Sequence, residues 1–270
     1  MKIINSLSGG KTSSYMAFHY PADYNIFSLV RIEDVNCKPK DESIIKYISD
    51  KIGKDFIATA ESDKILYVMR DLEQMLGKEI IWTTGKTFEQ ICFEKKALPN
   101  LMMRFCTTEM KMKPIFEFCY NNFGMIEMCI GFRYDEKERA NKQNTKFKTI
   151  IGKSKTGNRN KWGEIEWRTL DFPLIRNKIC HFHVKDWAEK TNLIFPEDSN
   201  CVGCFWKPIP QLRKNFDDEP LKMRWFMELE KKLNRTFKKE ITYEQIKSIG
   251  LQSDFIFGTG SGCQAGYCTD

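Results

Sequence analysis

The chain has 270 residues, of which 41% are apolar and 29% are charged. This length predicts one large domain with an appendage, and the composition excludes a chain that is disordered throughout. No apolar stretch approaches the roughly 18 residues of a membrane-spanning helix, and residues 1–10 lack the apolar segment of a secretory signal. We therefore expect a cytoplasmic protein without a membrane partner. The formal net charge of +7 favours anionic partners, which are phosphates or nucleic acid.

Strands and helices are expected to alternate along residues 1–135. The apolar patterns predict strands at residues 2–6, 25–32, 55–59, 79–83 and 125–131. They predict helices at residues 12–19, 42–52, 63–76 and 111–120. Such alternation builds βαβ units, so we expect an α/β fold with a doubly wound, mostly parallel sheet and helices on both faces.

Two further regions follow this α/β core in the sequence. Residues 136–165 hold few apolar anchors and read as a basic loop, a lid or a small hairpin. Residues 166–270 are expected to be largely helical and to complete the core, with a helix at 219–233. Five large apolar side chains are also expected in the core: Leu101, Met102, Met103, Trp225 and Phe226.

The basic region has two interpretations. Its cationic residues are Lys137, Arg139, Lys142, Lys146, Lys148, Lys153, Lys155, Arg159 and Lys161. They form either a solvated surface loop or a contact for a polyanion, such as a lid over the substrate or a nucleic-acid acceptor bound along residues 137–161.

A glycine-rich run follows the first predicted strand and opens the first predicted helix. It consists of Ser8, Gly9, Gly10, Lys11, Thr12, Ser13 and Ser14. Glycines allow a tight turn whose backbone N–H groups face an anion, and the helix N-terminus and Lys11 add positive charge. A Walker A loop is excluded, because Asn5 stands where that motif needs its first glycine. The run is therefore either a different phosphate loop or a glycine-rich turn that Thr12 or Ser13 caps.

The same run resembles the pyrophosphate loop (SGGxxS) of the adenine nucleotide α-hydrolase-like superfamily. Four later segments are similar to motifs of its phosphoadenylyl-sulfate (PAPS) reductase-like branch. These segments are residues 104–107 (RFCT) with Lys111, residues 131–136 (GFRYDE) with Arg139, residues 172–174 (FPL) with Val184 and Trp187, and residues 200–204 (NCVGC). The matched motifs run in order from residue 8 to residue 204.

The resemblance implies that ATP or PAPS binds at the carboxyl edge of the sheet, with its phosphates on residues 8–14. It implies further that Arg104, Lys111, Arg133 and Arg139 hold anionic groups. Simpler roles stay open, since Lys111 could cover a helix, and Arg133 and Arg139 could pair with nearby carboxylates. Glu33 and Asp34, after the second predicted strand, either bind a ribose or Mg²⁺ or are solvated.

Ten cysteines are many for a chain of this length. Cys201 and Cys204 form a CxxC unit, which is half of a metal site, a thiol–disulfide pair or two packed cysteines. The resemblance implies a metal and adds Cys106, although Phe105 replaces the first cysteine of the family's pair. We expect the fourth ligand to be Cys268, ahead of Cys263 and Cys180, and a [4Fe–4S] cluster ahead of Zn²⁺. Cys92, Cys119 and Cys129 are expected to be core residues.

Three functions compete. In the first, ATP with Mg²⁺ is cleaved between its α- and β-phosphates, with Lys11 and Arg133 acting on the phosphates, to activate an acceptor for sulfur or nitrogen transfer. In the second, a PAPS or adenylyl-sulfate reductase uses the Cys263 thiolate and a thioredoxin-like reductant. The unaltered SGG loop and the unfamiliar sequence around Cys263 count against that reaction. In the third, the chain is a non-catalytic nucleotide sensor. The sequence leaves open whether the chain also binds a sulfur donor and whether it forms a homodimer.

Overall fold

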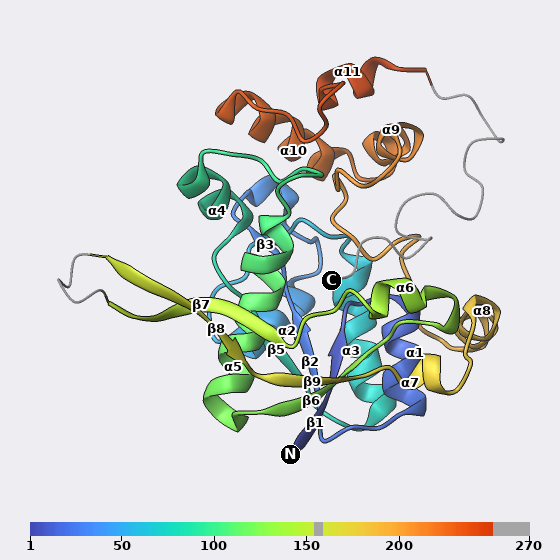
Figure 1. Cartoon of the computed structure of the whole chain (residues 1–270). Helices are drawn as coiled ribbons and strands as arrows, with labels where there is room; N and C mark the ends of the chain where they lie inside the picture. The colour runs from blue at the N-terminus through green and yellow to red at the C-terminus, as the bar shows by residue number, and fades with distance from the viewer. Residues whose placement is uncertain (154–158, 251–270) are drawn as a thin grey trace.

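The centre of the molecule is a five-stranded sheet in which all strands are parallel (Figure 1). The computed structural model describes residues 1–153 and 159–250. The strand order is β5-β2-β1-β6-β9, and the strands are β1 (Lys2–Leu7), β2 (Tyr24–Ser28), β5 (Ile80–Thr83), β6 (Ile126–Ile130) and β9 (Arg168–Asp171). The predicted α/β class with a parallel sheet is confirmed.

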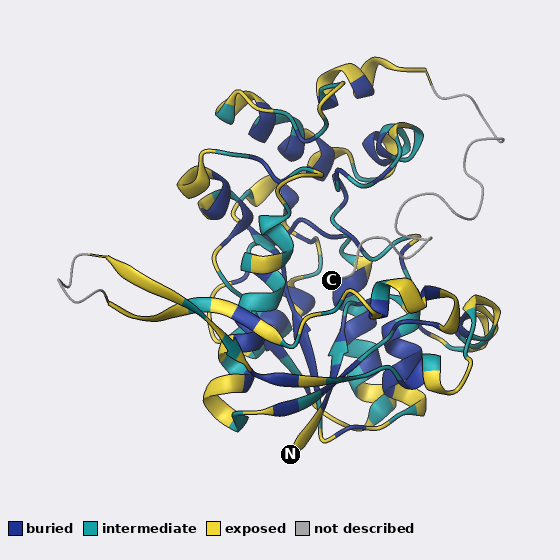
Figure 2. Ribbon diagram, in the orientation of Figure 1, coloured by how far each residue is buried: buried dark blue, intermediate teal, exposed yellow. Residues whose placement is uncertain are grey.

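Helices cover both faces of this sheet. One face packs on α1 (Lys11–His19), α2 (Glu42–Ile52) and α3 (Lys64–Leu76), and the other packs on α5 (Lys113–Phe123). Alternate strand residues enter the two cores, so that Ile4 packs with Phe116 of α5 while Leu7 packs with helices on the opposite face. Figure 2 shows the buried residues along these contacts.

The strand order places a topological switch beside β1. The chain runs outward from β1 through β2 to β5 and then returns to β6 on the other side of β1. Such a reversal opens a crevice at the carboxyl ends of the two central strands. Gly131 follows β6 at this point, and a Cβ added there would lie 3.3 Å from the Cα of Ser13. The absence of a side chain lets the end of β6 approach the start of α1.

Several predicted boundaries were wrong. Residues 25–32 are two strands, because the chain leaves the sheet after β2 and β3 (Arg31–Ile32) pairs antiparallel with β4 (Ala58–Thr59) in a separate ladder. The helix expected at 111–120 is a π-helical segment, η2 (Thr107–Met112), followed by α5. The sequence analysis missed β9 and α4 (Phe88–Lys95). Gly10, rather than Thr12 or Ser13, is the N-cap of α1.

The basic region forms a hairpin that projects from the body of the molecule (Figure 1). Its strands are β7 (Lys146–Lys153) and β8 (Asn160–Glu166). Short elements precede it, namely η3 (Tyr134–Glu136) and α6 (Lys137–Ala140). Phe147 anchors the base of the hairpin by stacking on Phe116, with ring centroids 4.5 Å apart.

The remaining helices lie in the C-terminal part of the chain. They are α7 (Pro173–Arg176), α8 (His181–Lys190), α9 (Ile209–Asp218), α10 (Pro220–Leu233) and α11 (Tyr243–Ser248). A second core cluster joins α9, α10 and α11 to α4 and to η1 (Val35–Cys37). Trp225 and Phe226 belong to it, as expected. None of the described helices is long and apolar enough to cross a membrane.

The expectation that residues 101–103 are core was wrong. Leu101, Met102 and Met103 are 60%, 92% and 46% exposed. They lie in a tight turn in which Asn100 and Met103 exchange two backbone hydrogen bonds of 3.1 Å. The hydrogen bonds of this turn join backbone groups of the loop itself, so its apolar side chains remain exposed.

Candidate functional site

The glycine-rich run forms a turn between β1 and α1. Gly9 has a φ of +75°, and Gly10 is the extended N-cap residue. The Ser13 hydroxyl holds the turn closed, since it accepts a hydrogen bond from the Ser8 backbone N–H and donates one to the Gly10 carbonyl, both at 3.1 Å. The turn therefore presents the free N-terminal end of α1, which attracts anions.

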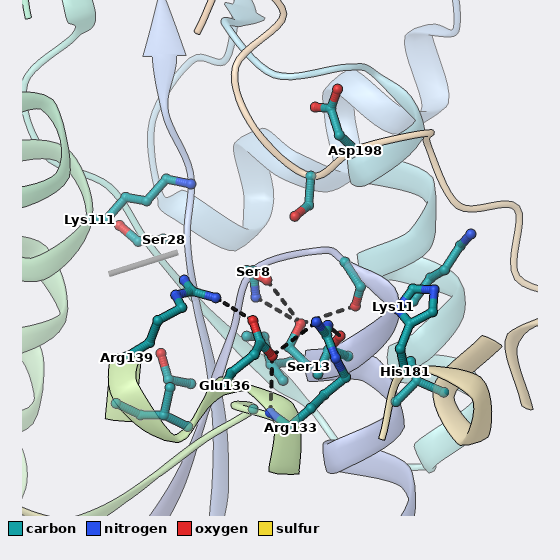
Figure 3. A pocket seen from close by; sticks show the side chains of 18 of the residues that line it. Ser8, Lys11, Ser13, Ser28, Lys111, Arg133, Glu136, Arg139, His181 and Asp198 are labelled. Carbon is teal, nitrogen blue, oxygen red and sulfur yellow. Dashed lines mark hydrogen bonds and ion pairs between the residues drawn. The ribbon is translucent and has the colours of Figure 1, made fainter. Parts of the chain in front are cut away.

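This turn lies on the wall of a cavity of about 580 Å³ (Figure 3). Ser8, Gly10, Lys11, Thr12 and Ser13 all line the cavity. Six cationic side chains line it in total, and they are Lys11, Lys111, Lys185, Arg133, Arg139 and Arg168. Four carboxylates also line it, and they are Asp135, Glu136, Glu197 and Asp198. Positive charge predominates at the helix N-terminus, so the cavity suits an anion with several charges.

Arg133 links the end of β6 to the glycine-rich turn. Its Nη1 donates to the Thr12 hydroxyl at 3.2 Å, and its side chain is only 9% exposed. The other guanidinium nitrogens contact Asp135 and Glu136 at 3.3 Å. Arg139 holds the second oxygen of Glu136 at 2.5 Å. Each arginine lines the cavity and pairs with a carboxylate (Figure 3), so the simpler role is observed, and the binding of anionic groups stays a prediction.

Lys111 reaches the cavity from the π-helical segment. Its ammonium group lies 2.8 Å from an oxygen of Glu61, whose side chain is fully buried. Burial opposes the charge of Lys111, but the Glu61 carboxylate and the thiols of Cys201 and Cys106 outweigh it and raise the pKa of this lysine. Lys111 consequently stays charged, and it lies near both the cavity and the thiols of Cys106 and Cys201.

Some expected nucleotide ligands lie elsewhere. Arg104 does not line the cavity, because its guanidinium stacks on Trp206 at 5.3 Å, near the cysteines. The hydroxyl of Ser14 is buried behind the turn. Glu33 accepts hydrogen bonds from Thr87 and Gln90. Gly9 shapes the turn without lining the cavity.

Asp34 is also removed from the cavity. Its carboxylate accepts from the backbone N–H of Asn36 and caps η1. The carboxylates that line the cavity are Asp135, Glu136, Glu197 and Asp198, and no three of them bring their oxygens within 4.8 Å of one another, so they could supply Mg²⁺ with one or two ligands beside the phosphates of a substrate.

The tertiary structure brings Cys106, Cys201 and Cys204 into one group. Cys201 forms an isolated antiparallel bridge with Glu61, and the Cys204 backbone N–H closes a turn on the Cys201 carbonyl at 3.1 Å. Burial raises the pKa of Cys106 to about 11 and raises the pKa values of Cys201 and Cys204. Cys204 raises the pKa of Cys106 further, and Cys204 and Cys106 both raise that of Cys201. Without a metal these thiols are protonated at neutral pH.

The surroundings of the cysteine group fit a multiply charged metal centre. Lys111 is near Cys106 and Cys201, while Lys207 and Lys238 act electrostatically on Cys204. Within residues 1–153 and 159–250, only Glu127, Cys129 and Asp171 bring three ligand atoms within 4.8 Å of one another, and the cysteine group does not. A tetrahedral Zn²⁺ with bonds of about 2.3 Å needs thiolates only about 3.8 Å apart. The choice between an iron–sulfur cluster and zinc for this group stays a prediction.

The fourth expected ligand cannot be placed. Cys268 and Cys263 lie outside the described residues. Cys180 is at the N-cap of α8 and contacts the Lys178 carbonyl.

Three other cysteines are core residues, as expected. Cys92 and Cys119 are fully buried, and Cys129 is 5% exposed. Burial raises the pKa of Cys92 and Cys106 raises it further, so this core thiol lies near Cys106.

Sequence reasoning missed several cavity residues. His181, Val184 and Lys185 share one face of α8, and their spacing of three and four was a usable signal. Trp187 packs against Tyr15 of α1 at 5.6 Å and so holds α8 beside the glycine-rich turn. Arg168 and Ser199 gave no comparable signal, since only the folded chain brings them to the cavity.

Comparison with known proteins adds no relative. The chain matches no family model, and no curated protein or solved structure is significantly similar to it. The function therefore has to be argued from the site itself.

Proposed function

We propose that the chain is a PAPS reductase-like member of the pyrophosphate-loop enzymes. In this proposal it cleaves ATP between the α- and β-phosphates to activate an acceptor for sulfur or nitrogen transfer. The observation that carries the proposal is the turn at residues 8–13, which opens an N-terminal helix end at the switch point into a cationic cavity of about 580 Å³. This cavity is in the size range of small-molecule sites.

The protein would act mainly by positioning and by neutralising charge. The backbone N–H groups of the turn would receive phosphate oxygens, and Lys11 and Arg133 would offset the charge that develops on the leaving pyrophosphate. An acceptor oxygen attacks the α-phosphorus, the bond to the β-phosphate breaks, and pyrophosphate leaves. The sulfur or nitrogen nucleophile then displaces AMP from the adenylated acceptor. Cavity carboxylates such as Asp135 and Asp198 would hold Mg²⁺, which would offset the negative charge of the phosphates.

The cysteine group would serve the same reaction. Cys106, Cys201 and Cys204 would hold a [4Fe–4S] cluster, which supplies or binds the transferred sulfur when it is present. Lys111 supports this arrangement, because it lies between the cavity and the thiols and stays charged.

The closeness of the cavity to the thiols also favours a second candidate, the reduction of PAPS or adenylyl sulfate. There a thiolate such as Cys263 attacks the sulfate sulfur, releases the adenine nucleotide and forms a thiosulfonate. A thioredoxin-like dithiol then releases sulfite and becomes a disulfide.

Nucleotide binding tests the proposal first. Lys11→Ala and Ser8→Ala should weaken ATP binding at least about tenfold in calorimetric titrations, because each removes a partner of the phosphates. The matched control is Lys46→Ala on α2, whose ammonium group is exposed and pairs with Asp50. Unchanged binding in both loop variants would refute the assignment of the turn.

Turnover separates the candidates. Pyrophosphate release from ATP supports transferase chemistry, whereas sulfite release from PAPS with thioredoxin supports the reductase. Nucleotide binding without either product supports the third candidate, a non-catalytic sensor.

Metal content tests the cysteine group. Anaerobically purified protein should be brown, absorb near about 400 nm and hold about four Fe per chain. Cys201→Ser should lose the iron, and Cys119→Ser, on the buried face of α5, should keep it. One Zn per chain without colour would contradict the cluster.

A further inference from the structure

The β7–β8 hairpin is attached to the wall of the cavity. Gln143 lines the cavity and lies three residues before β7, and Arg168 lines it and lies two residues after β8. At about 3.3 Å per residue, the eight residues of β7 reach about 26 Å. Figure 1 shows this ribbon extending away from the body. Both of its strands therefore connect the cavity to a distant outer end.

Charge is distributed unevenly along the hairpin. At the base, Lys146 is paired in register with Glu166, and Lys148 is paired with Glu164. Toward the outer end the described residues carry Lys153, Arg159 and Lys161 and no carboxylate. A solvated ribbon needs no such separation, whereas a polyanion bound at the outer half would be stabilised by it.

Large apolar side chains are exposed in the same outer half. Trp162 is 58% exposed, and its register partner Ile150 is 47% exposed. Ile151 is 48% exposed and lies over Gly163, where an added Cβ would be 2.5 Å from its Cδ1. Lys153 is on the same face of the ribbon as Trp162, through its register partner Asn160. An exposed indole with a lysine on its own face is a combination that binds single-stranded nucleic acid, since bases stack on the ring while ammonium groups contact phosphates.

We propose that the outer half of this hairpin binds a single-stranded segment of nucleic acid. Trp162 stacks on a base, and Lys153, whose register partner Asn160 is on the Trp162 face, contacts a flanking phosphate. Lys161 is on the opposite face of the narrow ribbon and contacts a further phosphate where the strand passes around its edge. The bound strand follows the ribbon toward Gln143 and Arg168 and so reaches the nucleotide cavity. The binding itself is independent of the proposed function, and only the role of the strand as acceptor rests on that function.

Fluorescence anisotropy of labelled oligonucleotides of about 15 nucleotides tests this inference with the full chain. Single-stranded RNA and DNA should both bind, and more tightly than the matching duplex. Trp162→Ala should weaken binding about tenfold. Lys153→Gln combined with Lys161→Gln should lower the slope of log Kd against log salt by about 1.4 between about 50 and about 200 mM KCl.

Two controls keep this test separate from the proposed function. Phe93→Ala removes a half-exposed aromatic ring from α4 and should leave oligonucleotide affinity unchanged. ATP binding by the hairpin variants should equal that of the unaltered chain, because neither Trp162 nor the two lysines line the cavity.

Several outcomes would overturn the inference. It fails if oligonucleotides do not bind, if duplex binds as tightly as single strands, or if the hairpin substitutions leave affinity and salt slope unchanged. Binding only to anionic phosphatidylserine vesicles would assign the hairpin to a membrane surface instead. Loss of ATP binding by Lys11→Ala with intact oligonucleotide binding supports the hairpin site independently.

Discussion

At the residue scale, the side chains around Lys11 determine how the cavity responds to pH. His181 lies beside Lys11 (Figure 3). Burial lowers the pKa of His181, and the nearby Arg133, Lys11 and Lys185 lower it further against the opposing effect of Asp135. The free protein therefore keeps this imidazole neutral at pH 7. A bound polyanion offsets those cations, so the pKa of His181 rises when the ligand binds.

This linkage predicts that acidification strengthens nucleotide binding. Because the bound state takes up a proton, ATP affinity should rise as the pH falls from about 8 to about 6. In His181→Gln the rise should be smaller than in the unaltered chain, while the titration of the nucleotide itself is common to both. Calorimetry in two buffers of different ionisation enthalpy measures the proton uptake. Identical pH profiles would contradict the role of His181.

Gly9 carries a second prediction at this scale. Its φ of +75° is unfavourable for any other residue, and an added Cβ would lie 2.4 Å from Cγ2 of Ile65. Gly9→Ala should therefore displace the turn and abolish ATP binding. Gly53→Ala is the matched control, because Gly53 also has a positive φ but its Cβ would meet nothing within 4 Å. The control should lose about 1–2 kcal/mol of stability and keep ATP binding.

At the element scale, one carboxylate joins α10 to the segment that follows it. Glu230 accepts the backbone N–H groups of Phe237 at 2.9 Å and Tyr243 at 2.7 Å. Burial raises the pKa of Glu230, and the two hydrogen bonds oppose that rise. Each carboxylate oxygen of Glu230 accepts one hydrogen bond, and an amide has only one accepting oxygen, so glutamine cannot make both bonds.

Glu230→Gln should lower the free energy of unfolding by about 1–3 kcal/mol, since one N–H then faces another donor. Chemical denaturation followed by circular dichroism measures the change. Glu228→Gln, at a half-buried position of the same helix, should change stability by less than about 0.5 kcal/mol. Equal losses in the two variants would show that the two hydrogen bonds of Glu230 are unimportant.

Sequence patterns predicted elements where a local signal was strong. The apolar spacing of α2 and α3 marked both helices to within one residue. Residues 25–32 (NIFSLVRI) are mostly apolar, and no turn residue such as glycine or proline interrupts them, so nothing local showed that the chain leaves the sheet after Ser28. The four residues of β9 carry no alternation, and their place is determined by pairing with β6. For α4 a signal existed, because Thr87 and Gln90 form a capping box.

At the scale of the whole molecule, the cavity joins segments that are distant in the sequence. The glycine-rich turn, η2, the end of β6, α8 and residues 196–199 all contribute to its wall. A ligand that binds only this assembled wall must stabilise the folded state. At about 100 times its Kd it adds about 2.7 kcal/mol to the free energy of unfolding.

ATP should accordingly raise the Tm by about 5 °C or more in a thermal-shift experiment. Lys11→Ala should abolish most of this shift at the same ATP concentration, and Lys46→Ala should keep it. An equal shift in the Lys11 variant would mean that ATP binds elsewhere on the molecule.

The sequence by itself determined those features of the protein that depend only on residues close together in the chain. The parallel α/β class, the turn at Ser8–Ser13 and the CxxC unit follow from local periodicity, glycine conformation and spacing. The tertiary structure alone decided which distant side chains meet. In the folded chain Arg104 stacks on Trp206 away from the cavity, and Lys111 pairs with Glu61 between the cavity and the thiols. The charged β7–β8 hairpin extends from the cavity wall. Such contacts depend on packing between segments far apart in the chain, which no local pattern encodes.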